Sequence, residues 1–403
     1  MAIGATTVVV AVVVFIIVAL VGADSGSTGT EAGSSSTGPA VPLAAASAWP
    51  TGAVATVAMG DLADPANTFW ELFVRTQGST QWSLATPLGT ASNGGLVAGV
   101  GPSGSVTAGV LPSAFLTFSP VASSRDLGAT WAPGLLPGAL LSAPDALATS
   151  STGTVAAVVT NKKGAAPKVV VAGPDLASWN EPAGLHAALA AASNCSGAKP
   201  TRVSFAASGT LLVGLECSGG SDGGVLVAQG GTTWRRGEPQ GIAAPGTNFQ
   251  PLRLTTVATA VVDVALVVRN GLGTGVQASW SSDGGSTWSS GPIVAIPTGW
   301  KVASVGVGGT GVGGTGNVRA TAVVVLLSHG AQRRINAIAA PTSSWITLPP
   351  GPSGTATAVA TDSGVDALAV SGGRETTWSW TSGSDRWMVG STERVPIQFG
   401  SSG

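Results

Sequence analysis

The 403-residue chain has little charge and few of the side chains that usually bind metals. Only 9% of its residues are charged, 18 Lys and Arg against 19 Asp and Glu, and the formal net charge is -1. A nucleic-acid-binding protein normally carries a basic stripe, so this composition argues against a nucleic-acid partner. The two His and two Cys form no Cys-x-x-Cys motif and no His cluster. We therefore predict no metal site and no cofactor.

Beyond residue 24 the sequence lacks long stretches with helical periodicity, apart from a short Ala- and Leu-rich segment at 185–192. Short runs of Val, Thr and Ala instead flank small Ser-Gly turns, at 96–106, 151–153, 207–209 and 362–364. Alternation around tight turns is typical of antiparallel hairpins. Together with 59 Gly and 25 Pro, these features predict an all-β fold.

The first 23 residues contain no charged side chain, and 8–20 consist almost wholly of Val, Ile, Phe and Ala. A helix of this length spans the ~30 Å hydrocarbon layer of a membrane. Residues 1–23 are therefore predicted to be a transmembrane anchor, or a signal sequence cleaved after the small residues at 21–23. Residues 24–41, rich in Gly, Ser and Thr, are predicted to be a flexible linker. We expect the rest of the chain outside the cytoplasm, held at the cell membrane or secreted.

One eight-residue pattern, Ser-x-Asp-x-Gly-x-Thr-Trp, occurs twice, at 124–131 and 281–288, and we call these segments the two box turns. Asp accepts hydrogen bonds from nearby backbone N–H groups, Gly permits a positive φ, and Trp provides a large apolar surface for packing. We assign the fixed residues a structural role: Ser124, Asp126, Gly128, Thr130 and Trp131 in the first turn, and Ser281, Asp283, Gly285, Thr287 and Trp288 in the second.

Other Trp residues follow shorter polar turns, so that Trp recurs about every 50 residues, the length of one four-stranded propeller blade with its loops. The positions are Trp82, Trp131, Trp179, Trp234, Trp288, Trp345 and Trp387. The box pattern resembles the Asp-box of the sialidase-like (BNR-repeat) β-propeller superfamily. The resemblance implies a propeller over residues 42–399, and the Trp series predicts seven blades, with six or eight as alternatives.

The resemblance also raises the question of sialidase activity. Sialidases of this superfamily use a Tyr nucleophile paired with a Glu, an Asp acid/base and three Arg residues that bind the substrate carboxylate. The chain contains no Tyr and no Arg-Ile-Pro motif near its first predicted blade, so we exclude this mechanism and assign no catalytic residue. Other glycosidases use two carboxylates, and acids expected on the loops opposite the box turns are Asp61, Asp64, Asp145, Asp222, Glu238 and Glu375. None of them lies in a recognisable motif.

The two cysteines, Cys195 and Cys217, both fall in the fourth predicted blade. Antiparallel pairing would bring these positions to one end of the blade, so we expect a disulfide, with two buried free thiols as the alternative. A disulfide and an apolar leader both indicate a location outside the cytoplasm.

The predicted loops opposite the box turns also carry most of the basic residues, among them Lys162, Lys163, Arg269, Arg333, Arg334 and Arg374. They could form a docking face for an anionic glycan or a partner protein, or simply reflect the preference of charges for loops. We therefore expect a non-catalytic, membrane-tethered propeller that binds an unknown protein or polysaccharide. The alternative is a secreted glycoside hydrolase with an unrecognised carboxylate pair.

Overall fold

The computed structural model describes residues 44–49, 52–60, 68–79, 81–87, 96–101, 104–110, 118–137, 144–160, 166–192, 194–239, 247–309, 321–371 and 374–394. The chain divides into two units, Met1–Ser36 and Thr37–Gly403. The N-terminal helix predicted at 1–23, the linker at 24–41 and the end of the predicted propeller at 395–399 all lie outside the described residues. Within the described ranges, no helix is long and apolar enough to cross a membrane.

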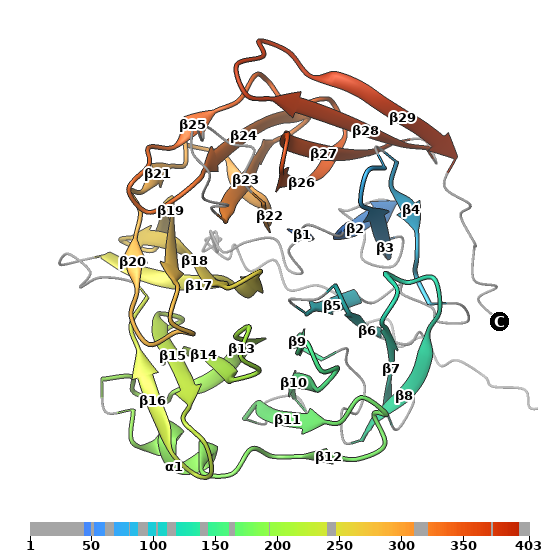
Figure 1. Ribbon diagram of the computed structural model, residues 1–403. Helices are drawn as coiled ribbons and strands as arrows, with labels where there is room; N and C mark the ends of the chain where they lie inside the picture. Colours follow the sequence, from blue (N-terminus) through green and yellow to red (C-terminus); the bar gives the residue numbers. More distant parts are fainter. Residues whose placement is uncertain are drawn as a thin grey trace, which may run out of the picture. The chain divides into compact units, whose positions relative to one another are not determined.

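The second unit is a β-propeller, and its described residues include one short helix (Figure 1). Five of its sheets are separate, and each contains four strands that pair in chain order, with a fifth strand added in one of them. The first contains Leu96–Val100 (β5), Val106–Val110 (β6), Phe118–Ser124 (β7) and Ala132–Pro137 (β8). The second contains Ala146–Thr149 (β9), Val155–Val159 (β10), Lys168–Ala172 (β11) and Trp179–Asn180 (β12). The helix Leu185–Ala190 (α1) follows it, within the segment where the sequence indicated a helix.

The third separate sheet contains Lys199–Phe205 (β13), Leu211–Glu216 (β14), Asp222–Ala228 (β15) and Trp234–Gly237 (β16). The fourth contains Thr247–Val257 (β17), Ala260–Arg269 (β18), Leu272–Ser281 (β19) and Ser289–Ser290 (β20), with Val294–Ala295 (β21) also paired to β19. The fifth contains Thr355–Thr361 (β26), Gly364–Ser371 (β27), Arg374–Thr381 (β28) and Met388–Arg394 (β29).

The remaining eight strands form one sheet made of two runs of four. One run contains Ala44–Trp49 (β1), Gly52–Gly60 (β2), Thr68–Thr76 (β3) and Ser83–Leu84 (β4). The other contains Lys301–Gly308 (β22), Ala322–His329 (β23), Gln332–Ile338 (β24) and Ile346–Thr347 (β25). They join through a parallel pairing of β1 with β22. Arg253 of β17 reinforces this junction, because its guanidinium donates to the carbonyls of Ala46 and Val305 and, at 2.6 Å, to Ser47 Oγ.

We use the word run for each set of four strands that follow one another in the chain, in the separate sheets as well as in the eight-stranded one. The first strands of successive runs contact one another, from β5 through β9, β13, β17, β22 and β26 to β1. The series closes because β2 and β3 contact β5. Three hydroxyl pairs join neighbouring runs: Thr107 with Thr149 at 2.8 Å, Ser204 with Thr256 at 3.0 Å, and Ser304 with Thr357 at 2.6 Å. Each pair satisfies buried polar groups that would otherwise weaken the packing. The seams between sheets are thus both apolar and hydrogen-bonded.

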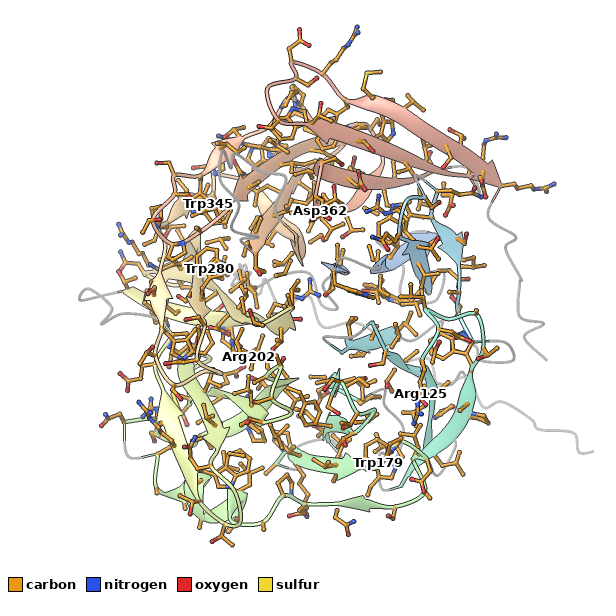
Figure 2. The ribbon with its side chains drawn as sticks, viewed as in Figure 1. Arg125, Trp179, Arg202, Trp280, Trp345 and Asp362 are labelled. Carbon is orange, nitrogen blue, oxygen red and sulfur yellow. A yellow bond between two sulfur atoms is a disulfide. The ribbon has the colours of Figure 1, made fainter. Side chains whose placement is uncertain are left out.

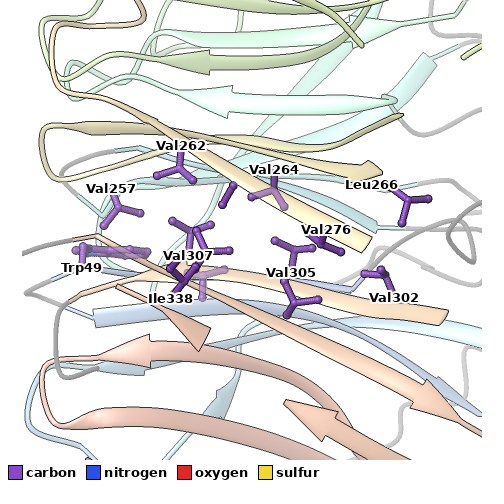
Figure 3. Packing of buried hydrophobic residues seen from close by; sticks show 14 of the residues in the cluster. Trp49, Val257, Val262, Val264, Leu266, Val276, Val302, Val305, Val307 and Ile338 are labelled. Carbon is purple, nitrogen blue, oxygen red and sulfur yellow. The ribbon is translucent and has the colours of Figure 1, made fainter. Parts of the chain in front are cut away.

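The largest apolar cluster lies between sheets and consists mainly of Val (Figure 3). Val262 and Val264 of β18 and Val305 and Val307 of β22 are fully buried there. β-Branched side chains pack well on pleated surfaces, which explains why Val predominates in these strands. On the neighbouring seam, a Cβ at Gly306 would lie 2.0 Å from the carbonyl oxygen of Ala358, so glycine is needed where β22 meets β26.

The two box turns share their main internal hydrogen bonds. In the second, Asp283 accepts from Thr287 N at 2.8 Å, Thr287 Oγ1 at 2.6 Å and Ser281 Oγ at 2.8 Å. Asp126 accepts the corresponding bonds in the first turn, from Thr130 N at 2.9 Å, Thr130 Oγ1 at 2.6 Å and Ser124 Oγ at 2.8 Å. Gly128 and Gly285 have φ values of 81° and 92°, the left-handed conformation that the pattern predicts.

The Trp series marks one position in the repeat. Each of the seven is the first residue of the outermost strand of its run, or directly precedes that strand. Four of the indoles donate N–H to a backbone carbonyl of the preceding run: Trp179 to Leu135, Trp234 to Ala183, Trp345 to Pro292 and Trp387 to Pro349 (Figure 2 labels Trp179 and Trp345). These bonds, 2.7 to 3.1 Å long, connect consecutive runs near their outer strands.

Cys195 and Cys217 are joined by a disulfide with a Cα–Cα separation of 4.9 Å. The expected bridge is therefore confirmed, and the alternative of two free thiols is wrong. The bridge ties the segment after α1 to the residue that follows β14.

Candidate functional site

Two clefts lie on either side of the β13–β16 sheet. Both are at the end of the sheet where the turn between β13 and β14 and the turn between β15 and β16 lie. The larger, of about 640 Å³, faces the β9–β12 sheet, and the smaller, of about 340 Å³, faces the β17–β20 sheet. Ser208, Thr210 and Gly230 line both clefts, so the two turns of the β13–β16 sheet form a ridge between them.

The turn from β15 to β16 explains why there is space here. It is a degenerate box turn in which Gln229 replaces Asp, and the next two residues are glycines. Gly230 and Gly231 have φ values of 98° and 57°, and a Cβ at either would meet no atom within 4 Å. Backbone bonds alone close the turn, from Gln229 N to the Thr233 carbonyl and from Thr233 N to the Gly230 carbonyl. Because its two glycines have no side chains, the turn leaves space open on both sides of the ridge.

The larger cleft has an aromatic wall and a polar rim. Trp234 is half-buried, and its indole N–H donates to the Ala183 carbonyl at 2.9 Å, which holds the ring in place. Phe205 is buried beneath the rim. The polar lining groups include hydroxyls and an amide, from Ser178, Asn180 and the hydrogen-bonded pair Ser208 and Thr210. Such a surface offers apolar contact to one face of a ligand and hydrogen bonds to its edges.

The described residues that line the larger cleft include one carboxylate, Glu181, and it is already paired. Its Oε1 lies 2.6 Å from Nζ of Lys168, and both side chains are exposed. In the smaller cleft the acid is Asp283, which belongs to the second box turn. Burial opposes its ionisation, but hydrogen bonds from Thr287, Ser281 and Ser286 outweigh this effect and lower the pKa of Asp283 to about 2. Asp283 is therefore a fixed anion near neutral pH and cannot supply a proton.

The other acids considered from the sequence have different partners. Asp145 accepts a hydrogen bond from Thr160 Oγ1 at 2.6 Å, and Glu238 lies 3.9 Å from Arg236. Glu375 is on β28, while Asp61 and Asp64 lie outside the described residues. The described members of the set therefore do not form a shared site.

Asp222 instead belongs to a buried ionic cluster that could not be predicted from the sequence. Arg202 of β13 binds Asp263 of β18, and its NH2 lies 2.9 Å from Oδ1 of Asp222 (Figure 2 labels Arg202). Burial disfavours the charged guanidinium, but the two aspartates outweigh this effect and raise the pKa of Arg202. The cluster connects the third and fourth separate sheets. Its one visible sign in the sequence is Asp263, the single charged residue inside the apolar run 260–268.

The predicted basic face lies at the opposite ends of the strands from the two clefts. The turns between the second and third strands of three runs carry basic residues at or next to the strand ends, namely Arg269, Arg333 and Arg374. Arg269 and Arg374 are exposed, but Arg333 donates to the carbonyls of Thr355, Gly330 and Gln332. Half-buried Arg334 reaches Thr347 Oγ1 at 3.3 Å, and Lys162 and Lys163 lie outside the described residues. The guanidinium of Arg333 thus serves the fold.

No protein-family model matches the chain, and no curated protein matches its sequence. Among solved structures, a GH74 xyloglucanase from Xanthomonas campestris is similar, with a TM-score of 0.52 and 13% identity over 83% of this chain and 51% of that chain. The chain thus spans about half the length of the xyloglucanase. A candidate 6-phosphogluconolactonase from Bacteroides fragilis has a TM-score of 0.50 and 12% identity over 86% of this chain and 96% of that chain. At these identities the similarity shows the fold alone, a β-propeller.

Proposed function

We propose that the chain is an extracytoplasmic seven-bladed β-propeller that binds a neutral polysaccharide in the larger cleft and does not cleave it. The observation that carries the proposal is the lining of this cleft. An indole held by its own hydrogen bond stands beside hydroxyl and amide groups, and the one carboxylate among the described lining residues is already paired with a lysine.

The chemistry of the cleft suits a sugar ring. The C–H face of a sugar packs against an aromatic ring, and Trp234 offers such a ring at little entropic cost because its indole is already fixed. Ser178, Asn180 and Ser208 supply donors and acceptors for sugar hydroxyls. A volume of about 640 Å³ also falls within the range of small-molecule sites, enough for a few sugar units of a longer chain.

Binding without cleavage is favoured by the carboxylates. Glycoside hydrolysis with two acids needs carboxyl groups about 5–9.5 Å apart on either side of the scissile bond. Among the described residues that line the larger cleft, Glu181 is the one carboxylate, and it is paired with Lys168. We therefore propose a binding role for this site.

The blade count and the superfamily are part of the same proposal. Seven blades result if each of the five separate sheets and each of the two runs of the eight-stranded sheet is counted as one blade, and this is the count we propose. The repeated Trp at the outer strand of every run supports this count. The matching hydrogen bonds of the two box turns support a relationship to the Asp-box superfamily.

The proposed location rests on the disulfide and on the predicted leader. Disulfides persist in oxidising compartments, which supports a place outside the cytoplasm for the propeller. If residues 1–23 are retained, they would tether it to the membrane, and the linker at 24–41 would let it reach a polysaccharide in the envelope.

Affinity measurements on matched tryptophan variants test the binding site. Wild type, Trp234→Ala and Trp345→Ala would be titrated with a panel of neutral polysaccharides that includes xyloglucan. Both indoles are half-buried and donate to the preceding run, but only Trp234 lines the larger cleft. We expect Trp234→Ala to weaken binding about tenfold, since losing an aromatic contact removes about 1.4 kcal/mol. Trp345→Ala should bind as wild type does.

Asn180→Ala, which leaves the inter-run bond of Trp234 intact, should also weaken binding, by a smaller factor. Equal losses in Trp234→Ala and Trp345→Ala would show that stability rather than ligand contact was measured. The absence of binding to every member of the panel would refute the proposed ligand class.

A further inference from the structure

Two glutamates face each other on the outer strands of the β26–β29 sheet. Glu375 of β28 and Glu393 of β29 are a register pair, so their side chains lie on the same face of the sheet. The Cβ atoms of such pairs are about 4.5–5.5 Å apart, and like charges placed directly opposite are destabilising. Glu375 is only 4% exposed, and its Oε2 has no hydrogen-bond partner among the described residues. This arrangement would be unfavourable unless a positive species neutralised it.

A third oxygen lies on the same face. Thr377 follows Glu375 by two positions in β28, and side chains alternate along a strand, so both point to one side of the sheet. Thr377 is 1% exposed, and its Oγ1 also lacks a hydrogen-bond partner in the described part of the chain. A buried hydroxyl without a partner is costly, and its position beside the two carboxyl groups suggests that a ligand satisfies it.

The positive groups nearby are committed elsewhere. On this face of the sheet, Leu368 and Val370 of β27 pair with Thr377 and Glu375, and Asp366 comes next. Asp366 binds Arg75 of β3 at 2.5 Å, across the seam to the β1–β4 run. Arg374 and Arg394 also form a register pair, but they lie on the opposite face of β28 and β29.

On β3, Glu71 shares a face with Arg75 and binds Thr86 Oγ1. Among the described residues, neither Glu375 nor Glu393 forms an ion pair with a basic side chain. The two carboxyl groups therefore face each other with no positive side chain to balance them in the described part of the chain.

We propose that Glu375, Glu393 and Thr377 bind a divalent cation, and that this cation is Ca²⁺. Calcium takes six to eight oxygen ligands in flexible geometry. Two carboxylates can supply up to four oxygens and the hydroxyl a fifth, with water completing the shell. The ion would hold the outermost strand β29 against β28, next to the seam with the β1–β4 run. Because the two glutamates come from different strands, no local sequence motif announces the site.

Calcium titration of the full-length chain tests the proposal. Wild type, Glu375→Gln and Thr377→Val would be freed of metal with a chelator and titrated with CaCl₂ at pH 7.5, by calorimetry and by thermal unfolding. Glu238→Gln is the control, because Glu238 is an exposed acid that directly follows β16, in a different sheet's loop. We expect one saturable site with a Kd of about 10⁻⁴–10⁻³ M, typical of extracellular modules, and a higher Tm with calcium.

Glu375→Gln should lose at least tenfold in calcium affinity and most of the calcium-dependent rise in Tm. Thr377→Val should weaken binding by a smaller factor, and Glu238→Gln should respond as wild type does. Two results would overturn the proposal: no calcium response in wild type at about ten times the upper Kd, or an undiminished response in both Glu375→Gln and Thr377→Val. A wild-type Tm that depends on pH but not on calcium would assign the pair to proton binding and equally refute a cation site.

Discussion

Removing the Arg202 guanidinium should destabilise the propeller strongly. Arg202→Met keeps most of the side-chain volume but removes the charge that binds Asp263 and Asp222, and the donor to the Leu215 carbonyl at 3.2 Å. Asp263 is fully buried and Asp222 nearly so. Breaking a buried ion pair from one side costs about 3–5 kcal/mol, because an uncompensated charge stays behind. This is a large part of the 5–15 kcal/mol by which domains are usually stable.

Equilibrium unfolding in urea measures the effect. With an m-value of about 3 kcal/mol/M, the midpoint should fall by about 1–2 M. Arg235→Met is the matched control, because exposed Arg235 makes one backbone contact, at 3.2 Å to Ser286, and should change stability by less than about 0.5 kcal/mol. Adding Asp263→Asn to Arg202→Met should recover part of the loss. If the free energy of unfolding of Arg202→Met were within about 0.5 kcal/mol of the wild-type value, the conclusion that the cluster stabilises the fold would be wrong.

Three further predictions concern acids and cysteines. The folded-state pKa of Asp283 is about 2, below the ordinary aspartate value of 3.8, so this residue should contribute stability that is present above pH 4 and lost as the pH falls towards 2. In a series of thermal-unfolding measurements at different pH values, Asp283→Asn should flatten the decline in Tm over this interval. Glu375, with its pKa raised from 4.5 to about 7, should make the calcium-free protein less stable as the pH rises through this interval, and Glu375→Gln should remove the decline. Non-reducing mass spectrometry of the exported protein should show Cys195 linked to Cys217, and reduction should cost about 3 kcal/mol; two alkylatable thiols in the folded protein would contradict this.

Local chemistry made much of the fold predictable. The box turns require Asp, Gly and Thr at fixed spacing, so the third strands β7 and β19 end at Ser124 and Ser281 as the pattern indicates. The Trp series marks the outer strands for the same reason. The pattern does not predict how long the outer strands are, and β20 covers only Ser289–Ser290. The parallel pairing of β1 with β22 joins distant segments and has no local sign.

The candidate site was less predictable because it depends on contacts between runs. The larger cleft needs the low Gly230–Gly231 turn beside Trp234, and these glycines appear in the sequence merely as a weak copy of the box. Glu375 was considered as an acid, but its partner Glu393 becomes visible only when β28 and β29 are paired. Residues that meet across strands and sheets cannot be found from spacing alone.

The most direct test of the central claim measures binding and turnover on one polysaccharide with one preparation. The full-length protein would be incubated with the neutral polysaccharide that it binds best, and the release of new reducing ends would be followed beside a binding isotherm. We expect saturable binding that Trp234→Ala weakens, with no reducing ends above those of the polysaccharide alone. Chain cleavage that the wild type catalyses and that a carboxylate variant abolishes would contradict it.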